Sequence, residues 1–507
     1  MNNENISVAI IGAGASGTIL ACQIIEKACN ERGIGSTVYL IEKGTDFGPG
    51  LAYSTPLSSH ILNMRADTLG VEKDNPLHFM EWLREHRDFC FNDITSSRYD
   101  INYPPRKIYG KYLRYILDSS IKKTVSGPCR IELVSGEAVD IDHNGSSIRV
   151  RMADGNMIKA DNAVLAPGNF PGSFLHELKG IKGYIPYPWP VSVITENIPR
   201  DSPVCIIGAG LSAIDTLFTL MENDHRGKIT FISRCGILPK VQGEPVDYEL
   251  KYLSKENISG IIAETDGKSL PFNVIKNLYF KEMETAEEKE IDWLQVFNPE
   301  GSIAEILERD ISRAEAGIIL YQAALTAAGP MTGYIWNKLS VENRMIFDRM
   351  YKTLWTVYRH PMPLINAKKI LNALKTGQLD IQSGCICVRT CGKEGFEIDV
   401  STRFGIPYTI KTPAVINATG QGLDVTKFND PLINRLIEKG LIDPHPNGGI
   451  QVDYKTSEVV GKNRNLIHGL FALGEITRGV HFFTNGIVPN MSVSDRIADY
   501  ILGRDAA

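Results

Sequence analysis

The chain lacks the cysteine spacing of a redox or zinc protein. Its 507 residues include nine cysteines but no C-x-x-C pair, which argues against a dithiol reductase. Cys385, Cys387 and Cys391 follow a C-x-C-x3-C pattern that fits no common zinc spacing. We expect them to be alternating residues on a strand, with a metal role as the alternative, and we predict no metal site.

Long apolar runs, an export signal and an excess of basic residues are also absent. No stretch approaches the roughly 20 apolar residues that span a bilayer, and residues 1–10 lack the basic start and apolar core of a secretory signal. The formal net charge is −5, without long runs of one sign, which argues against nucleic-acid binding. With free thiols, these absences predict a soluble cytoplasmic protein without a membrane or nucleic-acid partner. The oligomeric state stays open.

Two segments have the order strand, glycine turn, helix and strand that is typical of dinucleotide-binding folds. In the first, the largely apolar residues 7–11 precede a glycine turn and a helix to about Asn30, and the next strand ends at Glu42. In the second, residues 203–207 begin the same series, and its second strand ends at Arg234. The length allows two or three packed domains, and the sequence predicts that two of them are dinucleotide folds.

The region from about 285 to 376 is expected to be helical, and residues 378–410 are expected to form short strands. Ser340 is a predicted N-cap for a helix that continues to about Tyr358. Gly377 is expected to end the helical region. An apolar stripe at helical spacing is expected to pack in the core; it consists of Ile346, Met350, Leu354 and Val357.

The first glycine loop carries the strongest chemical signal. Gly12 allows a turn that a side chain would obstruct, Gly14 lets the backbone approach a pyrophosphate, and Gly17 lets the helix pack closely on the strand. The helix N-terminus then faces the phosphates with free N–H groups. Glu42 can accept both ribose hydroxyls of an adenosine, so we predict dinucleotide binding here.

The second loop, residues 208–213, is a G-x-G-x-x-A variant of the same motif. Its second strand ends in Ser233 and Arg234 rather than in an acid. A carboxylate there would repel a 2′-phosphate, whereas an arginine can pair with it, so the sequence favours NADPH over NADH. The alternative is that Arg234 is a solvated residue at a strand end.

Two further apolar strands end in glycine turns. Paired-dinucleotide flavoproteins carry an A-T-G-like turn at each point where the chain leaves one fold for the other, and Gly168 and Gly420 match it. Near the end, a strand leads into Gly474 and Glu475, where FAD proteins of this build use Gly-Asp to hold the ribityl chain. The N-terminus of the last helix, which continues through Leu502, is expected to face the flavin pyrimidine edge and to favour reduced flavin.

With these motifs in place, the chain resembles one bacterial flavoprotein family. Residues 47–55, FGPGLAYST, and residues 60–66, HILNMRA, are similar to its signatures G-x-G-x-A-Y-x-T and H-L-L-N-x-x-A. Residues 105–113 and 473–479 resemble its later blocks, and the similarity thins in the helical region. This is the FAD/NAD(P)-binding oxidoreductase family, whose characterised members include aspartate N-monooxygenases that form nitrosuccinate. The motif order is more distantly similar to that of ornithine and lysine N-hydroxylases.

The resemblance implies tightly bound FAD, NADPH as reductant and molecular oxygen as oxidant. The implied reaction is N-hydroxylation of an amine or amino acid through a flavin C4a-hydroperoxide. A FAD-dependent dehydrogenase or oxidase without oxygen insertion shares every nucleotide motif and stays an alternative, and a colourless protein would favour a non-catalytic nucleotide-binding regulator. Residues 183–190 lack the histidine of Baeyer–Villiger enzymes, and Gln421 replaces the tyrosine that follows A-T-G in ornithine-type hydroxylases.

Arg359 and His360 are the candidate catalytic residues, because the family has a similar Arg-His pair at about this place. Arg359 could clamp a substrate carboxylate with two hydrogen bonds. The alternative is that Arg359 pairs with a nearby acid and that His360 caps the helix end. Arg65, Lys240 and His481 are further candidates for the flavin cleft, and His60 is expected to be positional.

We therefore predict an α/β fold with two Rossmann-like dinucleotide-binding domains, for FAD and NADP, and a mainly helical substrate region. The predicted ranges are 1–195 for the first part of the FAD domain, 196–280 for the NAD(P) domain, 281–380 for the helical region, and 381–507 for the return to both domains. The predicted cofactor-binding residues are Gly12, Gly14, Ser16, Gly17, Glu42, Lys43, Tyr53, Asn63, Arg106, Gly168, Gly208, Gly210, Ser212, Ser233, Arg234, Gly420, Gly474, Glu475 and Pro489.

Overall fold

The chain folds into two compact units. The computed structural model describes residues 5–30, 35–72, 74–91, 100–125, 127–145, 147–264, 269–392, 395–401 and 406–503. Unit 1 comprises residues 1–170 and 422–507, and unit 2 comprises residues 171–421. The chain changes unit directly after the turns at Gly168 and Gly420, which confirms the predicted crossings. The four domain ranges, which are drawn by function, stay predictions.

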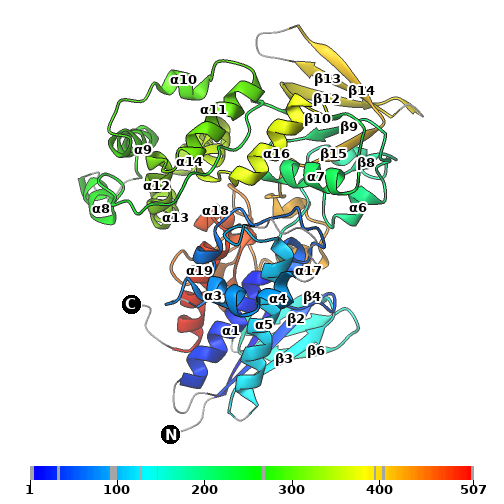
Figure 1. The fold of residues 1–507 in the computed structure, drawn as a ribbon. Helices are drawn as coiled ribbons and strands as arrows, with labels where there is room; N and C mark the ends of the chain where they lie inside the picture. Colours follow the sequence, from blue (N-terminus) through cyan, green and yellow to red (C-terminus); the bar gives the residue numbers. More distant parts are fainter. Residues whose placement is uncertain are drawn as a thin grey trace. The chain divides into compact units, whose positions relative to one another are not determined.

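Unit 1 is built on a parallel sheet with the order β16-β17-β7-β1-β2-β3, in which only β16 is antiparallel to its neighbour. Its strands β2 and β3 are labelled in Figure 1. Its strands are β1 (Asn5–Ile11), β2 (Gly35–Glu42), β3 (Arg130–Ser135), β7 (Asn162–Leu165), β16 (Glu458–Val460) and β17 (Leu466–Ala472), and a separate antiparallel sheet contains β4 (Ala138–His143), β5 (Ile148–Met152) and β6 (Met157–Ala160). Its helices are α1 (Ala15–Asn30), α2 (Gly50–Tyr53), α3 (His78–Glu85), α4 (Arg87–Phe91), α5 (Arg106–Thr124), α17 (Pro431–Glu438), α18 (Arg478–His481) and α19 (Ile487–Ile501).

Both faces of this sheet are covered, because alternate residues of a strand point to opposite sides. Val8 and Ile10 pack with α1 and α19 in one core cluster. Ala9 and Ile11 pack with the β4–β6 sheet and α17 in another. The near-continuous apolar run in β1 is therefore the pattern of a strand that is buried on both sides, as predicted.

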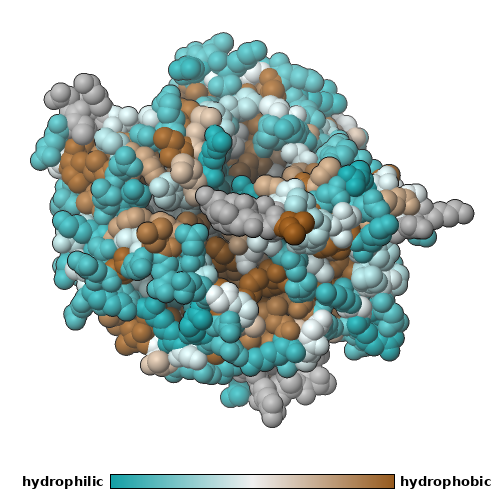
Figure 2. Space-filling model, turned by 90° about the horizontal axis from the view of Figure 1, so that it is seen from above, coloured by the Kyte–Doolittle hydropathy of each residue, from teal (hydrophilic) through white to brown (hydrophobic). Residues whose placement is uncertain are grey.

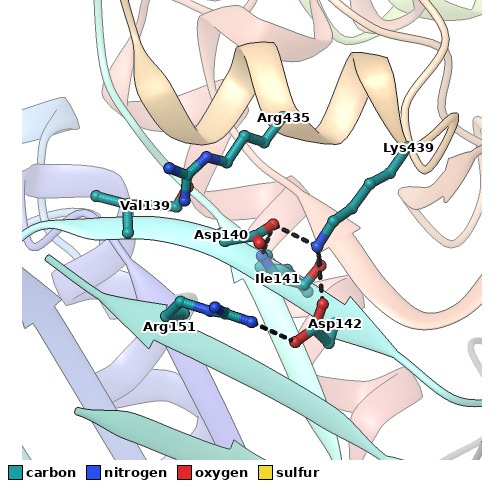
Figure 3. A network of polar contacts seen from close by, with 7 residues as sticks. All are labelled: Val139, Asp140, Ile141, Asp142, Arg151, Arg435 and Lys439. Atoms are coloured by element: carbon teal, nitrogen blue, oxygen red, sulfur yellow. Dashed lines mark hydrogen bonds and ion pairs between the residues drawn. The ribbon is translucent and has the colours of Figure 1, made fainter. Parts of the chain in front are cut away.

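Lys439, directly after α17, ties this helix to the β4–β5 hairpin (Figure 3). Its Nζ lies 2.6 Å from Asp140 Oδ1 and 2.7 Å from Asp142 Oδ1, and it donates to the Ile141 carbonyl. The hydrogen bond from Lys439 lowers the pKa of the Asp142 carboxyl, with Arg151 as a further contributor. These contacts fix the layer that covers one face of the unit 1 sheet.

Unit 2 contains a five-stranded parallel sheet with the order β11-β10-β9-β15-β8. Its strands are β8 (Tyr184–Ile185), β9 (Val204–Ile207), β10 (Ile229–Ser233), β11 (Leu379–Ser383) and β15 (Ala414–Asn417), and an antiparallel sheet contains β12 (Cys385–Thr390), β13 (Phe396–Ser401) and β14 (Tyr408–Thr412). Its helices are α6 (Ser192–Thr195), α7 (Leu211–Glu222), α8 (Lys255–Glu264), α9 (Phe272–Ala286), α10 (Trp293–Phe297), α11 (Ile303–Glu315), α12 (Leu320–Ala327), α13 (Gly329–Lys338), α14 (Val341–Met350), α15 (Lys352–Arg359) and α16 (Leu364–Lys375).

The helical part of unit 2 corrects two expectations. The side chain of Ser340 accepts a hydrogen bond from Asn343 N, which confirms the N-cap, but the helix ends at Met350 and α15 starts at Lys352. A single helix through Tyr358 is therefore wrong. The predicted core stripe is wrong too, because the break changes the helical register: Ile346 and Met350 are 41% and 64% exposed, whereas Val357 is buried. Helices also begin earlier than expected, at α8.

Strands β11–β14 confirm the short strands predicted after Gly377, whose φ is +75°. Cys385 and Cys387 lie two residues apart on β12 and are exposed, as expected for alternating strand residues. Cys391 lies directly after β12, so the expectation is wrong for this residue. Within the described ranges, no three His, Cys, Asp or Glu side chains gather as metal ligands would.

No described helix is both long and apolar enough to cross a bilayer. On the face drawn in Figure 2, hydrophobic side chains lie scattered among hydrophilic ones.

Candidate nucleotide sites and substrate region

The turn between β1 and α1 has two glycines that no other residue could replace without movement. At Gly12, φ is +109° and an added Cβ would lie 2.0 Å from the Ala166 carbonyl oxygen. At Gly17, a Cβ would lie 2.0 Å from the Gly12 carbonyl oxygen. The two positions have the steric roles that the motif predicts, a tight turn and a close approach of helix to strand.

Gly14 differs, because a Cβ there would make only ordinary contact, 3.5 Å from Gly50 Cα. The protein itself leaves room at this position. The first helical hydrogen bond of α1 runs from Thr18 N to Gly14 O, so the N–H groups of the first turn have no acceptor within the helix. A partly exposed loop with free N–H groups is the arrangement that binds a phosphate.

Glu42 lies at the carboxyl end of β2 and is half-buried beside this loop. Its Oε2 accepts a hydrogen bond from Ala13 N at 2.9 Å, and Oε1 lies 3.4 Å from Gly44 N. A carboxylate has about four acceptor positions, so Glu42 keeps capacity for ribose hydroxyls while it holds the loop. Lys43, the next residue, is 72% exposed and forms an ion pair with Glu137 at 2.7 Å.

The segment after β17 begins at the same end of the sheet as the β1–α1 loop, because β17 pairs in parallel with β7 and β7 pairs in parallel with β1. Gly474 has φ +88°, and Glu475 Oε2 accepts a hydrogen bond from Thr484 at 2.8 Å. Asn490, in the first turn of α19, donates to the Thr484 carbonyl at 2.8 Å and to Ser16 Oγ at 3.2 Å. The structure thus brings Ser16 and the Glu475 segment together, through an asparagine that sequence analysis did not single out.

Pro489 lies next to Asn490 in the first turn of α19 and is half-buried. The signal for Asn490 in the sequence is weak: one polar residue in an otherwise apolar helix start.

Three family-derived candidates come from separate segments: Tyr53 ends α2, Asn63 lies between α2 and α3, and Arg106 begins α5. Arg106 donates from Nε to the Ile61 carbonyl at 3.2 Å and from its backbone N to the His60 carbonyl at 2.7 Å. Asn63 is half-buried in the segment between α2 and α3. The Tyr53 ring lies 4.9 Å from that of Tyr109, and burial raises the pKa of Tyr53 to about 12.

Two of the remaining candidates are held by protein groups. His60 is buried with Nδ1 3.1 Å from Thr55 Oγ1, as expected for a positional residue. Arg65 forms an ion pair with Asp67 at 2.8 Å and a hydrogen bond with Asn102.

Unit 2 repeats the first turn. Gly208 has φ +126°, and a Cβ there would lie 2.5 Å from the Ala418 carbonyl oxygen. This matches the close approach that a Cβ on Gly12 would make to the Ala166 carbonyl oxygen. Gly210 is exposed, has open space around it and precedes α7, and Ser212 lies half-buried in the first turn of that helix. Both units therefore place a glycine loop at a helix N-terminus beside a glycine-ended crossing strand.

Strand β10, which follows α7, ends without a carboxylate. Ser233 Oγ accepts a hydrogen bond from Gly236 N at 3.0 Å, which shapes the turn. Arg234 is exposed, and its guanidinium lies 3.4 Å from Thr353 Oγ1. A solvent-accessible guanidinium at this place can reach a phosphate on a nucleotide ribose.

Arg359 ends α15 inside the helical part of unit 2. Burial lowers the pKa of its guanidinium, and the nearby Tyr279 partly offsets this. A Cβ on Gly329, the first residue of α13, would lie 2.9 Å from Arg359 Nη2. The positively charged guanidinium therefore lies against the N-terminus of α13, which carries a partial positive charge.

His360 caps α15 by donating from its backbone N to Thr356 O at 3.0 Å. Burial, with the charge of Arg359, lowers the pKa of its imidazole to about 3, so the side chain is neutral at pH 7. Its ring lies 5.4 Å from that of Trp355.

Lys240 and His481 also have protein partners. The Lys240 ammonium lies 3.0 Å from Asp310 Oδ2 and 5.2 Å from the centre of the Tyr358 ring. His481 is buried in unit 1 with Nε2 3.1 Å from Ser457 Oγ.

Comparisons with known proteins cover both the first site and the whole fold. Residues 9–170 match a family described as FAD-NAD(P)-binding. No curated protein matches the chain. The cadaverine monooxygenase of desferrioxamine biosynthesis from Erwinia amylovora, solved with FAD, is 15% identical over 98% of this chain and 94% of its own, with a TM-score of 0.58.

Two further solved structures match at the same level. L-lysine 6-monooxygenase from Pseudomonas syringae is 13% identical over 99% of both chains, with a TM-score of 0.58. An ornithine N-hydroxylase from Kutzneria sp. 744, solved with reduced FAD, NADP+ and ornithine, is 13% identical over 99% of both chains, with a TM-score of 0.57. At these identities the likeness shows the fold, and it confirms the predicted α/β class with two dinucleotide-type sheets.

Proposed function

We propose that unit 1 binds FAD at the β1–α1 loop. The residues fit this cofactor: Gly14 leaves space beside the free N–H groups of α1, and Glu42 offers acceptors for the ribose hydroxyls. Ser16, Gly474, Glu475 and Pro489 lie on the segments that would hold the rest of the molecule. Tyr53 at the end of α2, Asn63 in the segment after it and Arg106 at the start of α5 are further proposed contacts.

We propose NADPH as the second nucleotide, held at the loop from Gly208 to Ser212. The 2′-phosphate would pair with Arg234, beside Ser233. An acid at the end of β10 would select NADH instead, and the turn there contains none.

The reaction that we propose is N-hydroxylation of an amine or amino acid with molecular oxygen. Bound FAD would supply the chemistry, by accepting a hydride from NADPH and activating oxygen. The whole-chain likeness to a cadaverine, a lysine and an ornithine hydroxylase supports this class. The motif resemblance to aspartate N-monooxygenases favours a small amino acid as substrate.

Arg359 is our candidate for recognising a substrate carboxylate. Its guanidinium lies against the first residue of α13, so a carboxylate placed there could accept hydrogen bonds from both the guanidinium and the N–H groups of the helix start. His360 stays neutral at pH 7 beside it and can accept or donate a hydrogen bond without adding charge. We also propose that the enzyme works in the cytoplasm, which the free cysteines support.

The single observation that carries this proposal is the repeated steric arrangement at Gly12 and Gly208, one in each unit. It is tested by following NADPH oxidation by the FAD-loaded protein across a panel of amino acids and amines, with mass analysis of the products. We expect at least one product heavier by one oxygen atom. Hydrogen peroxide as the sole product would favour the dehydrogenase or oxidase alternative, and a protein that holds no flavin would contradict the proposal.

An Arg359→Lys variant tests the substrate contact, because lysine keeps the charge but not the paired hydrogen bonds. We expect a higher KM for carboxylate-bearing substrates and little change for simple amines. Equal changes for both classes would contradict the proposed role of Arg359.

A further inference from the structure

The backbone at Phe482 is strained. Its φ is +62° and its ψ is −60°, a combination that residues with side chains rarely adopt. Phe483 N donates to the His481 carbonyl at 2.7 Å, so residues 481–483 form a γ-turn with positive φ at its centre. Such backbone strain persists only where the surroundings impose it, and it is concentrated at functional sites.

Several contacts hold the turn in place. The Arg478 guanidinium lies 5.4 Å from the centre of the Phe482 ring, and both side chains are buried. On one side of the turn, His481 Nε2 lies 3.1 Å from Ser457 Oγ. On the other side, Thr484 is buried and donates to Glu475 Oε2.

The turn determines what the residues after it can reach. Because the chain reverses within three residues, Thr484 returns to Glu475, and its carbonyl accepts a hydrogen bond from Asn490 in the first turn of α19. The same Asn490 amide donates to Ser16 Oγ at the start of α1. The γ-turn therefore links the Glu475 segment and the N-termini of α1 and α19, all of which the proposed function assigns to FAD.

We propose that the γ-turn at Phe482 positions the FAD-binding segment, so that the bound flavin requires this strained backbone conformation. The inference rests on the proposed function. Phe482 is a positioning residue: its ring contact with Arg478 holds the backbone, and the backbone places Thr484 and the N-terminus of α19. No other residue with a side chain in the described ranges has positive φ within the segment from 474 to 490.

Glycine separates the backbone from the ring, because it adopts positive φ without strain. Phe482→Ala and Phe482→Gly both remove the ring contact, but only the alanine variant is strained when the turn forms. We expect the alanine variant to bind FAD about tenfold more weakly than the wild type, and the glycine variant to recover to within about threefold. We also expect the reduction potential of bound FAD to shift in the alanine variant and to return toward the wild-type value in the glycine variant.

Phe483 provides the matched control, since its φ is not positive. There, Phe483→Gly is expected to bind FAD no more tightly than Phe483→Ala, because glycine gains nothing at an ordinary φ. FAD affinity is measured by titration of the apoprotein, and the unfolding midpoint of each apoprotein shows that the variants fold.

Equal FAD affinities and potentials for the alanine and glycine variants at Phe482 would overturn the inference, whatever their stabilities. A wild-type protein that binds no FAD would instead overturn the proposed function. The two failures are therefore distinguishable in the same titration.

Discussion

Acid should destabilise unit 1 through His481. This side chain is 6% exposed, and burial, with the positive charge of Arg496, lowers the pKa of its imidazole from 6.5 to about 4, although Asp453 acts in the opposite direction. The unfolded chain therefore binds a proton that the folded chain does not. Stability from this group is fully present above pH 6.5 and is lost as the pH falls toward 4.

The size of the effect follows from the shift. A difference of about 2.5 pKa units corresponds to about 3.4 kcal/mol in full, of which about 2 kcal/mol is lost between pH 7.5 and pH 5. The assay is urea unfolding of the wild type and of His481→Gln, which keeps a polar group near Ser457 but takes up no proton. We expect the free energy of unfolding of the variant to fall by about 2 kcal/mol less over this interval.

If His481→Gln loses as much stability as the wild type between pH 7.5 and pH 5, the folded protein does not exclude the proton from His481, and the argument from burial is refuted.

Three further outcomes are expected. Gly12→Ala should destabilise unit 1 by about 3 kcal/mol or more, because the added Cβ would meet the Ala166 carbonyl. Gly14→Ala should unfold like the wild type and bind FAD at least about tenfold more weakly. Thermal unfolding and FAD titration measure these effects, and an unfolding midpoint for Gly14→Ala as low as that of Gly12→Ala would contradict the prediction. Arg234→Asp should reduce the preference for NADPH over NADH by roughly 10- to 100-fold in kcat/KM, since it replaces a phosphate partner by a repelling charge; an unchanged preference would refute the NADPH assignment. In the native protein, Cys385 should be alkylated rapidly and Cys205 only after denaturation, because Cys205 is buried and its thiol pKa is raised to about 12 by that burial; peptide mass mapping distinguishes the two, and early labelling of Cys205 would show that its strand opens.

The geometry of the first glycine loop could be predicted from sequence because its determinants are local. Gly12, Gly14 and Gly17 lie close together between β1 and α1, and Glu42 ends the adjacent strand, so strand periodicity and motif spacing predict where they lie. The second loop is predictable for the same reason. The crossings at Gly168 and Gly420 follow from an apolar strand that ends in glycine, which is again a short-range pattern.

Features that depend on tertiary contacts could not be predicted from the sequence. Asn490 meets Ser16 because β17 and β1 lie in one sheet, and the chain gives no local sign of that meeting. The stripe from Ile346 to Val357 has perfect helical spacing, but a break at Tyr351 exposes its first half. The positive φ at Phe482 likewise has no local sign in the sequence, since no residue preference would place phenylalanine there.

The β1–α1 loop at Gly12 is proposed to hold a flavin dinucleotide. The most direct test of this proposal is the number of FAD molecules that the purified chain binds. Equilibrium binding of FAD, read from the visible absorbance of the protein-bound fraction, should reach one FAD per chain in the wild type and should fail in a folded Gly14→Leu variant. A wild-type protein that binds no FAD at saturating concentration, or a Gly14→Leu variant that binds it as the wild type does, would contradict the account.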